Sequence, residues 1–259
     1  MTSKVFASTS GTEGPPEKAA LYKMIRKIEQ RRGSWINLQA DLNMDFSTPQ
    51  GKKASCRAEL VYDRLNEKIL LKGINEKKEL LFVFKTDDRN FELYLPRQKT
   101  NFTGSIFDLE DSPAIHSHLK ALDLYRALKP SVIAGEKTSL YKAADGLTRL
   151  EVKGPRGAMR EIFADASGDA VKEIYSKDGK PGTVLERLDF EQVKKSKKET
   201  FGFPRSIVVR SSGNETRLVF GSAHFGSASD PKAFDYGLPA ETRRVDVSQE
   251  FKKQQVLAG

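Results

Sequence analysis

Residues 36–46 read INLQADLNMDF and carry the clearest structural signal of the sequence. Every second residue from Ile36 to Phe46 is apolar, and the five residues between them are all Asn, Gln or Asp. A β-strand places alternate residues on one face, whereas an α-helix does not. The stretch therefore predicts one long strand with an apolar and a polar face, which is typical of an antiparallel sheet covered on one side.

Similar apolar patterns recur along the chain between short polar turns. The eleven strands predicted in this way are residues 37–46, 54–62, 69–74, 80–84, 91–95, 147–153, 158–165, 170–176, 183–190, 205–210 and 215–220. Connections this short join neighbouring antiparallel strands. A sheet of about eleven strands must also curl, because strand twist accumulates across it.

Two helices are predicted beside the strands. Pro15 and Pro16 open a first helix that ends at Gly33, and its apolar stripe indicates packing on the sheet, with a membrane-surface helix as the alternative. The residues of this stripe are Leu21, Met24, Ile25 and Ile28. After a predicted loop that begins at residue 101, Ser112 and Pro113 start a second helix that ends at Pro130. Its apolar residues are Ile115, Leu119 and Leu122 at helical spacing, joined by Leu124 and Leu128.

These elements predict a mainly β fold with some helix. We expect a curved antiparallel sheet that forms an open half-barrel, covered by the N-terminal helix and a mid-chain helical lid. A chain of 259 residues fits one domain of this kind, here residues 15–247. Residues 1–14 resemble a flexible tether without the apolar stretch of a signal peptide, and residues 248–259 form a polar tail. The protein is then either cytoplasmic or was preceded by a targeting segment.

The composition indicates binding rather than catalysis. The net charge of +9 permits attraction to nucleic acid, anionic lipid or an acidic partner, although the charges are scattered. The one dense run is Lys194, Lys195, Lys197 and Lys198, which we interpret as a solvated turn, with a phosphate-binding patch as the alternative. The single cysteine, Cys56, follows the apolar phase of its strand and indicates an inert thiol. No stretch of about 18 apolar residues occurs.

Motifs that support enzyme chemistry are not found in the sequence. The three histidines are not spaced as metal ligands, and there is no phosphate-binding loop, dinucleotide fingerprint or nucleophile elbow. We therefore expect no catalytic residues, no cofactor and no metal site. Base stacking on aromatic residues is disfavoured, because Phe82, Phe84 and Phe91 lie in phase with aliphatic residues, as core or pocket residues do.

Several segments together resemble one protein family. They are a helix ending in Arg31-Arg32, a long strand over residues 35–46, a strand over residues 55–63, LLFVF at residues 80–84, FELYLP at residues 91–96, FDYGLP at residues 234–239 and VDV at residues 245–247. In this order they resemble the LolA/LolB-like lipoprotein carrier superfamily over roughly residues 21–247. The nearest likeness is to a bacterial outer-membrane lipoprotein with this fold.

The resemblance implies an open β-barrel under a helical lid, with a cavity that accepts the acyl chains of lipoproteins. Ile115, Leu119 and Leu122 would belong to the lid. The cavity lining would consist of Ile36, Leu38, Leu42, Met44, Leu60, Tyr62, Ile69, Leu71, Phe82, Phe84, Phe91 and Leu93. Arg64 lies near the position of a functional arginine in the soluble carrier, with an exposed turn residue as the alternative. The sequence departs from the family in having Trp35 as its only tryptophan.

The resemblance and the composition together predict a non-catalytic module that binds lipids or lipoprotein acyl chains. We expect it in the periplasm, where it would be tethered to the outer membrane if it is itself a lipoprotein. An envelope protein or an anionic membrane surface is a further candidate partner. One alternative is a cell-envelope interaction protein with a filled core and a basic partner-binding surface. A lesser alternative is a protein that binds single-stranded nucleic acid.

Overall fold

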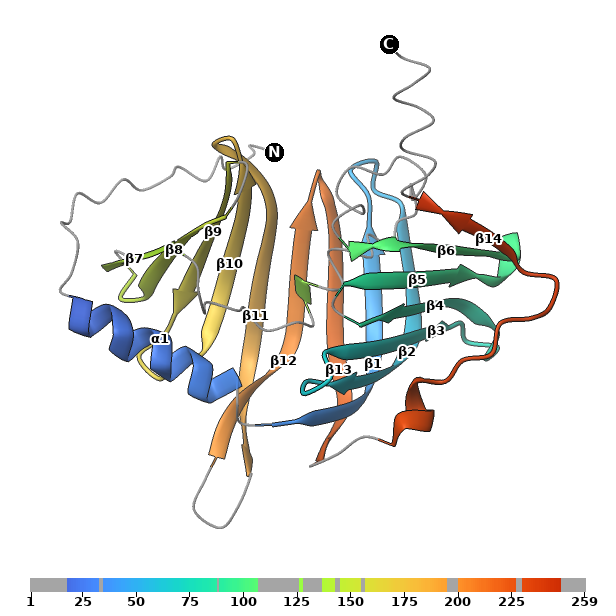
Figure 1. The fold of residues 1–259 in the computed structure, drawn as a ribbon, viewed down its shortest axis with the longest axis horizontal. Coiled ribbons are helices and arrows are strands. Elements are labelled where there is room, and N and C mark those ends of the chain that lie inside the picture. Colours follow the sequence, from blue (N-terminus) through green and yellow to red (C-terminus); the bar gives the residue numbers. More distant parts are fainter. Residues whose placement is uncertain are drawn as a thin grey trace. The chain divides into compact units, whose positions relative to one another are not determined.

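The computed structural model describes residues 18–32, 35–87, 89–106, 126–127, 137–142, 145–154, 157–194, 200–226 and 230–247. These residues form fourteen strands, one α-helix of 15 residues and two short 3-10 helices (Figure 1). The predicted mainly β class and the N-terminal helix are confirmed, and the strand number exceeds the predicted value of about eleven.

The elements have the following bounds: α1 Lys18–Arg32, β1 Asn37–Ser47, β2 Lys53–Asp63, β3 Lys68–Ile74, β4 Leu80–Thr86, β5 Asn90–Leu95, η1 Pro96–Gln98, β6 Thr100–Ser105, β7 Lys137–Lys142, β8 Thr148–Lys153, β9 Ala158–Ala164, β10 Ala170–Lys177, β11 Lys180–Lys194, β12 Thr200–Ser211, β13 Asn214–Gly226, η3 Pro231–Phe234 and β14 Arg243–Asp246. The strand order is β14-β6-β5-β4-β3-β2-β1-β13-β12-β11-β10-β9-β8-β7. The two end strands, β14 and β7, are not neighbours, so the sheet is open as predicted.

Strand β1 joins the early and late parts of the chain. It pairs antiparallel with β2 on one edge and with β13 on the other. On the β13 side the register shifts between Asp41 and Leu42, whose partners are Ser222 and Phe220. The extra residue, Gly221, forms a bulge that lets the apolar residues of β13 stay opposite those of β1.

Three strands were not predicted, and one of them corrects the sequence analysis. The stretch from residue 101 onwards was predicted to be a loop, but β6 occupies Thr100–Ser105 and pairs with β5. Gly104, which suggested a loop, lies opposite Phe91 inside this pairing. The other two, β7 and β14, are short strands at the two ends of the order, and β14 pairs with β6 in parallel.

The contacts divide the chain into two compact units, each of which we describe by itself. Unit 1 consists of residues 1–32 and 132–186, and unit 2 consists of residues 33–131 and 187–259. Strand β11 begins in unit 1 and ends in unit 2. A single domain over residues 15–247 stays a prediction.

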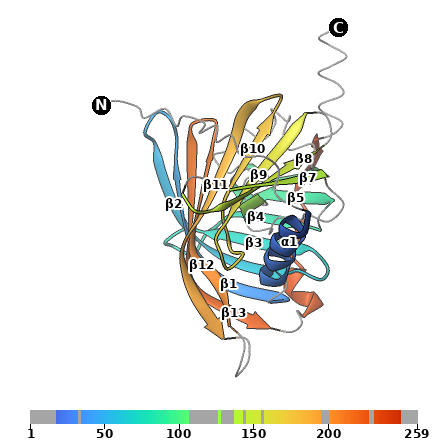
Figure 2. The ribbon, with the colours of Figure 1, turned by 90° about the vertical axis from the view of Figure 1, so that its left-hand side faces the viewer.

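Helix α1 covers one face of the unit 1 strands, as its apolar stripe predicted (Figure 2). Ile28 is its fully buried residue and packs into a cluster with side chains of β7, β8 and β9. The strand residues of this cluster are Leu140, Leu150, Val152, Ile162 and Ala164, and the helix adds Leu21, Met24 and Ile25 at its edge. Helical spacing of apolar residues therefore identified both the helix and its buried face.

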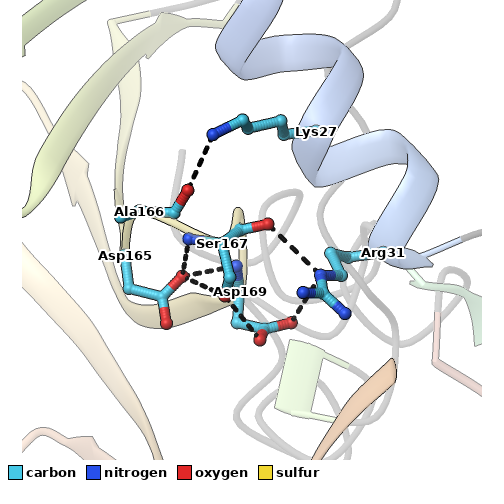
Figure 3. Close-up of polar contacts among 6 residues, drawn as sticks. All are labelled: Lys27, Arg31, Asp165, Ala166, Ser167 and Asp169. Atoms are coloured by element: carbon cyan, nitrogen blue, oxygen red, sulfur yellow. Dashed lines mark hydrogen bonds and ion pairs between the residues drawn. The ribbon is translucent and has the colours of Figure 1, made fainter. Parts of the chain in front are cut away.

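Polar contacts hold α1 to the turn between β9 and β10 (Figure 3). Lys27 donates a hydrogen bond from Nζ to the carbonyl oxygen of Ala166 at 2.8 Å. Arg31 donates from Nε to the carbonyl oxygen of Ser167 at 3.2 Å and lies 3.8 Å from Oδ1 of Asp169. Burial raises the pKa of the Asp169 carboxyl, while the bond from Ser167 and the charge of Arg31 oppose that increase.

The turn itself is fixed by the side chain of Asp165. Its Oδ1 accepts hydrogen bonds from the backbone N–H of Ser167 and of Asp169 and from the Ser167 hydroxyl. Gly168 sits between them with φ +92°, and its Cα faces the helix backbone so closely that a Cβ would lie 2.8 Å from Cβ of Lys27. Only glycine meets both demands, because it has no Cβ and tolerates positive φ.

Some predicted segments lie outside the described residues. These are the lid residues Ile115, Leu119 and Leu122, the tether over residues 1–14, the tail over residues 248–259 and the lysines that follow Lys194. Within the predicted second helix the structure describes only Arg126 and Ala127, which are helical, and Ala127 is buried. The lid therefore stays a prediction.

Replacing Gly168 by Ala should destabilise the protein more than replacing Gly179 by Ala. Both glycines have positive φ, but a Cβ on Gly179 would meet nothing within 4 Å. We expect Gly179→Ala to cost about 1 kcal/mol of left-handed strain and Gly168→Ala about 2 kcal/mol more from overlap with α1. Urea denaturation of both variants measures the difference, and equal losses would contradict the close approach of α1 to this turn.

Candidate functional site

The face of unit 2 that carries Leu38, Leu42 and Met44 of β1 is the candidate site, and we call it the apolar face. Strand pairing extends it across the neighbouring strands, because directly opposite residues point to the same side of a sheet. The central row runs through Ala40, Leu60, Leu71, Phe84, Leu93 and Phe102, one residue from each of β1 to β6. All six side chains are buried.

Two further rows flank the central one. The first runs through Phe225, Leu38, Tyr62, Ile69, Thr86 and Phe91. The second runs through Phe220, Leu42, Ala58, Gly73 and Phe82. The only polar side-chain groups in these three rows are the hydroxyls of Thr86 and Tyr62, and each of these residues is 2% exposed. Together the rows form a continuous apolar surface over β13 and β1 to β6.

The structure brings the predicted lining residues together on this face. Eleven of the twelve are buried in β1 to β5, and the exception, Ile36, lies just before β1 and is half-buried. Contact between these residues and a ligand stays a prediction. Alternation located those of β1 and β2, which have polar residues on their opposite face, and the family resemblance supplied those of β3 to β5.

One close contact on the apolar face could not be read from the sequence. The ring of Phe82 lies directly over Gly73 on the neighbouring strand, in the space that a Cβ at Gly73 would occupy. An aromatic ring that covers a glycine in this way replaces the missing side-chain packing of that glycine. The position of the Phe82 ring therefore depends on residue 73 being glycine.

An aromatic cluster that sequence reasoning missed lies where β1 begins. Trp35 contacts Tyr62 with ring centroids 5.3 Å apart and Phe225 at 6.1 Å. Phe225 in turn lies 5.1 Å from Phe201 and 4.9 Å from Phe203, both in edge-to-face geometry. Phe201, Phe203 and Phe225 come from β12 and β13, so only the pairing of β1 with β13 brings them to Trp35. The alternate positions of Phe201 and Phe203 indicate that their side chains share one face of β12 but not that they lie near Trp35.

Arg64, a predicted polar contact for the ligand, makes two hydrogen bonds within the protein. Its Nε donates to the carbonyl oxygen of Trp35 at 2.8 Å, and its backbone N–H donates to the carbonyl oxygen of Ile36 at 2.9 Å. The preceding Asp63 caps the same turn through the backbone N–H groups of Leu65 and Asn66. Arg64 thus ties the start of β1 to the β2–β3 turn, and a role in ligand binding stays a prediction.

The opposite face of β3 to β5 carries a second apolar cluster, which we call the outer cluster. It consists of Leu70, Val83, Tyr94 and Phe234. Phe234 belongs to residues 230–247, which we call the strap, and η3 in the strap is capped by Asp230. The ring centroids of Tyr236 in the strap and Tyr94 are 6.1 Å apart. Burial raises the pKa of the Tyr236 hydroxyl, and Tyr94 adds a smaller increase.

Strand pairing fastens the strap to the sheet. Strand β14 pairs with β6 from Arg243 to Asp246, and Lys99 forms an ion pair with Glu241 at 3.2 Å. The strap explains why β3 and β4 are apolar at consecutive positions such as Leu70 and Leu71. These two strands are buried on both faces.

No group of three or more His, Cys, Asp or Glu side chains in the described ranges could hold a metal ion. No helix among the residues that the structure describes has the length and apolar character needed to cross a membrane. Cys56 is half-buried in β2, opposite Met44.

Comparison with known proteins identifies the fold. A domain from Vibrio parahaemolyticus, provisionally assigned to outer membrane lipoprotein sorting, matches with a TM-score of 0.62 and 15% identity over 83% of this chain and 97% of that chain. A LolA superfamily protein from Nitrosomonas europaea gives a TM-score of 0.60 and 13% identity over 83% and 97% of the two chains. A DUF1329 family protein from Desulfovibrio piger gives 0.64 and 12% over 86% and 98%.

The chain therefore has a LolA-like fold, as the sequence resemblance predicted. No protein-family model and no curated protein matches the sequence. At this level of identity the likeness establishes the fold, and the function has to be argued from the site.

The thiol of Cys56 should react slowly in the folded protein. Burial, with a smaller effect of the Asp45 charge, raises its pKa from 9.0 to about 11. At pH 8 the reactive thiolate should be about 100-fold rarer than in the unfolded chain, so alkylation by iodoacetamide should slow by a similar factor. Because the chain has one cysteine, the measured rate reports this site alone.

The dependence of the alkylation rate on pH distinguishes a raised pKa of the Cys56 thiol from restricted access of the reagent. The rate should rise about tenfold for each pH unit until it levels off near pH 11. The free energy of unfolding should fall between about pH 9 and about pH 11, because the thiol loses its proton at lower pH in the unfolded chain than in the folded protein. A rate that already levels off near pH 9 would show that the pKa is not raised.

Proposed function

We propose that this protein binds the acyl chains of lipids or lipoproteins on the apolar face of unit 2, as a carrier or binding module without catalytic activity. The observation that carries the proposal is the continuity of the three rows over seven strands, in which the only polar side-chain groups are the hydroxyls of Thr86 and Tyr62. A hydrocarbon chain offers no hydrogen-bonding groups, so such a surface suits it and does not suit a polar substrate.

The expected energy of binding comes from the burial of methylene groups. Each contributes about 0.8 kcal/mol, so about ten buried methylenes would contribute about 8 kcal/mol before the cost of displacing what covers the face. This cost would set the affinity, and the predicted helical lid over residues 112–130 is the element that we expect to move. Release would then require the lid to open or a partner with higher affinity.

The LolA-like fold supports this function and a location in the cell envelope. Among the matched structures, one is assigned to outer membrane lipoprotein sorting and another belongs to the LolA superfamily. By analogy we propose that this chain acts in the periplasm, with or without a tether to the outer membrane. The aromatic cluster around Trp35 would form one end of the acyl site.

A second candidate function is that of a cell-envelope interaction protein with a filled core. The observation that favours it is the near-complete burial of the central row in the protein alone, where Leu71, Phe84 and Leu93 have no exposed surface. On this reading the apolar face is an ordinary core, and partners would bind through the basic surface. The two functions make opposite predictions for a bound lipid.

Mass spectrometry of an organic extract separates these two functions. The protein is purified without detergent and extracted, and the extract is compared with that of an unrelated protein from the same cells. Phospholipid or acylated peptide in stoichiometric amount supports the acyl-binding function. An empty extract, together with no uptake of a fluorescent fatty acid, supports the filled core.

A pair of adjacent leucines in β3 tests the location of the site. Leu71 lies in the central row of the apolar face, whereas Leu70 lies in the outer cluster, and both are at most 1% exposed. Replacing Leu71 by Asn should weaken the binding of a fluorescent fatty acid at least about tenfold, because a polar group then faces the hydrocarbon. Replacing Leu70 by Asn should change the affinity by less than about twofold.

The two variants control for each other. Both place an amide in an apolar cluster of the same strand, so both should lose several kcal/mol of stability to a similar extent. Fatty-acid titrations are done at a temperature at which circular dichroism shows each variant to be folded. Equal affinities for the two folded variants would place the acyl site elsewhere.

A further inference from the structure

Helix α1 concentrates the positive charge of unit 1. It contains six Lys or Arg residues and one Glu, a net charge of +5 in 15 residues. The other segment of the unit, residues 132–186, contains nine basic and nine acidic residues and is neutral overall. The excess charge of the unit therefore lies on a single amphipathic helix.

The basic residues of α1 divide into two groups by their contacts. Lys27 and Arg31 point to the β9–β10 turn and hold the helix to its sheet (Figure 3). Lys23 and Arg26 lie on the exposed side, and neither forms a hydrogen bond or ion pair with any residue that the structure describes. These two cations therefore have no evident role in holding the described fold together.

An aromatic side chain accompanies these two cations. Tyr22 is 64% exposed, although the ring of tyrosine is largely apolar. Residues 22, 23 and 26 lie on one side of a helix, and the apolar stripe around Ile28 occupies the other side. Tyr22, Lys23 and Arg26, which we call the exposed face of α1, share this side of the helix with the exposed Glu29.

This combination matches the chemistry of an anionic lipid surface. Lys and Arg are attracted to the negative surface of such a membrane, and their long side chains can lie along it with the charge in the headgroup layer. Tyrosine prefers the same layer, where its ring contacts acyl carbon and its hydroxyl stays hydrated. An acidic protein surface would attract the two cations as well but gives no comparable reason for an exposed Tyr22.

We propose that the exposed face of α1 docks unit 1 on an anionic phospholipid surface. This inference does not depend on the acyl-binding function, because it concerns another unit and other residues. The association should be weak and sensitive to salt, since each cation contributes about a fivefold gain in affinity and is largely screened at high ionic strength.

Co-sedimentation with lipid vesicles tests the proposal. Vesicles of phosphatidylcholine with about one third phosphatidylglycerol should bind the full chain, and pure phosphatidylcholine should bind it far more weakly. Binding should decrease steeply between about 0.05 and about 0.3 M salt. The double charge reversal Lys23→Glu with Arg26→Glu should lower the affinity at least about 25-fold, and Tyr22→Ala should lower it severalfold.

A second double variant serves as the matched control. Lys177 and Lys180 are exposed residues of the β10–β11 hairpin in the same unit. Their joint replacement by Glu changes the net charge by the same amount and should alter vesicle affinity by less than about twofold. Equal losses in both double variants would show that net charge alone drives the association, which would overturn the proposal.

Two further measurements distinguish docking from other binding events. The variant Leu71→Asn should still bind vesicles, and the Lys23/Arg26 variant should still take up a fluorescent fatty acid. If the protein binds dissolved poly-glutamate but no anionic vesicles at low salt, the exposed face would be assigned to an acidic protein partner. That result, or a failure to bind either probe, would overturn the proposal.

Discussion

The register of β1 against both of its neighbours is the constraint on which the rest of unit 2 depends. Alternate side chains of a strand point to opposite faces, so a slip of one residue would exchange Leu38 and Leu42 for Asn and Asp. Such a slip would have to break the pairing on both edges of β1, because β2 and β13 each place apolar residues opposite the apolar residues of β1. The bulge at Gly221 absorbs the one mismatch without moving the apolar face.

The sequence predicted an element together with its buried face where the two faces of that element differ in polarity. Strands β1 and β2 and helix α1 could be predicted together with their buried faces, because polar residues occupy their other side. Strands β3 and β4 could be located, but alternation alone does not orient them, since Leu70 and Leu71 are equally apolar. The residues assigned from the family resemblance, such as Leu71 and Phe84, do lie on the apolar face. The orientation depends on the strap, which follows β3 by more than 150 residues. Strand β6 was missed because Gly104 is typical of a loop. Only the pairing of β6 with β5, which places Gly104 opposite Phe91, shows that this residue belongs to a strand.

In the candidate site, the sequence predicted features that depend on one strand and not those that depend on pairing between distant strands. Alternation identified the apolar-face residues of β1 and β2, because each could be assigned from its own strand, and the family resemblance supplied those of β3 to β5. The aromatic cluster around Trp35 requires β12 and β13 to be placed beside β1, which no local pattern indicates. The contact of Phe82 with Gly73 requires the β3–β4 register. The bond from Arg64 to Trp35 could not be predicted, because a backbone carbonyl oxygen as partner has no sequence signature.

The apolar face and the outer cluster of unit 2 differ in the interactions that a lipid would have to break in order to enter. The outer cluster is closed by the strap, whose strand β14 shares backbone hydrogen bonds with β6 and whose helix η3 is capped by Asp230. Opening it would expose Phe234 and leave the edge of β6 unpaired, which costs burial and backbone hydrogen bonds at once. Residues of the apolar face are held by strand pairing within the sheet, so access to them does not require any of those pairings to open. If unit 2 binds an acyl chain, the apolar face is therefore the side on which it can do so without dismantling the sheet.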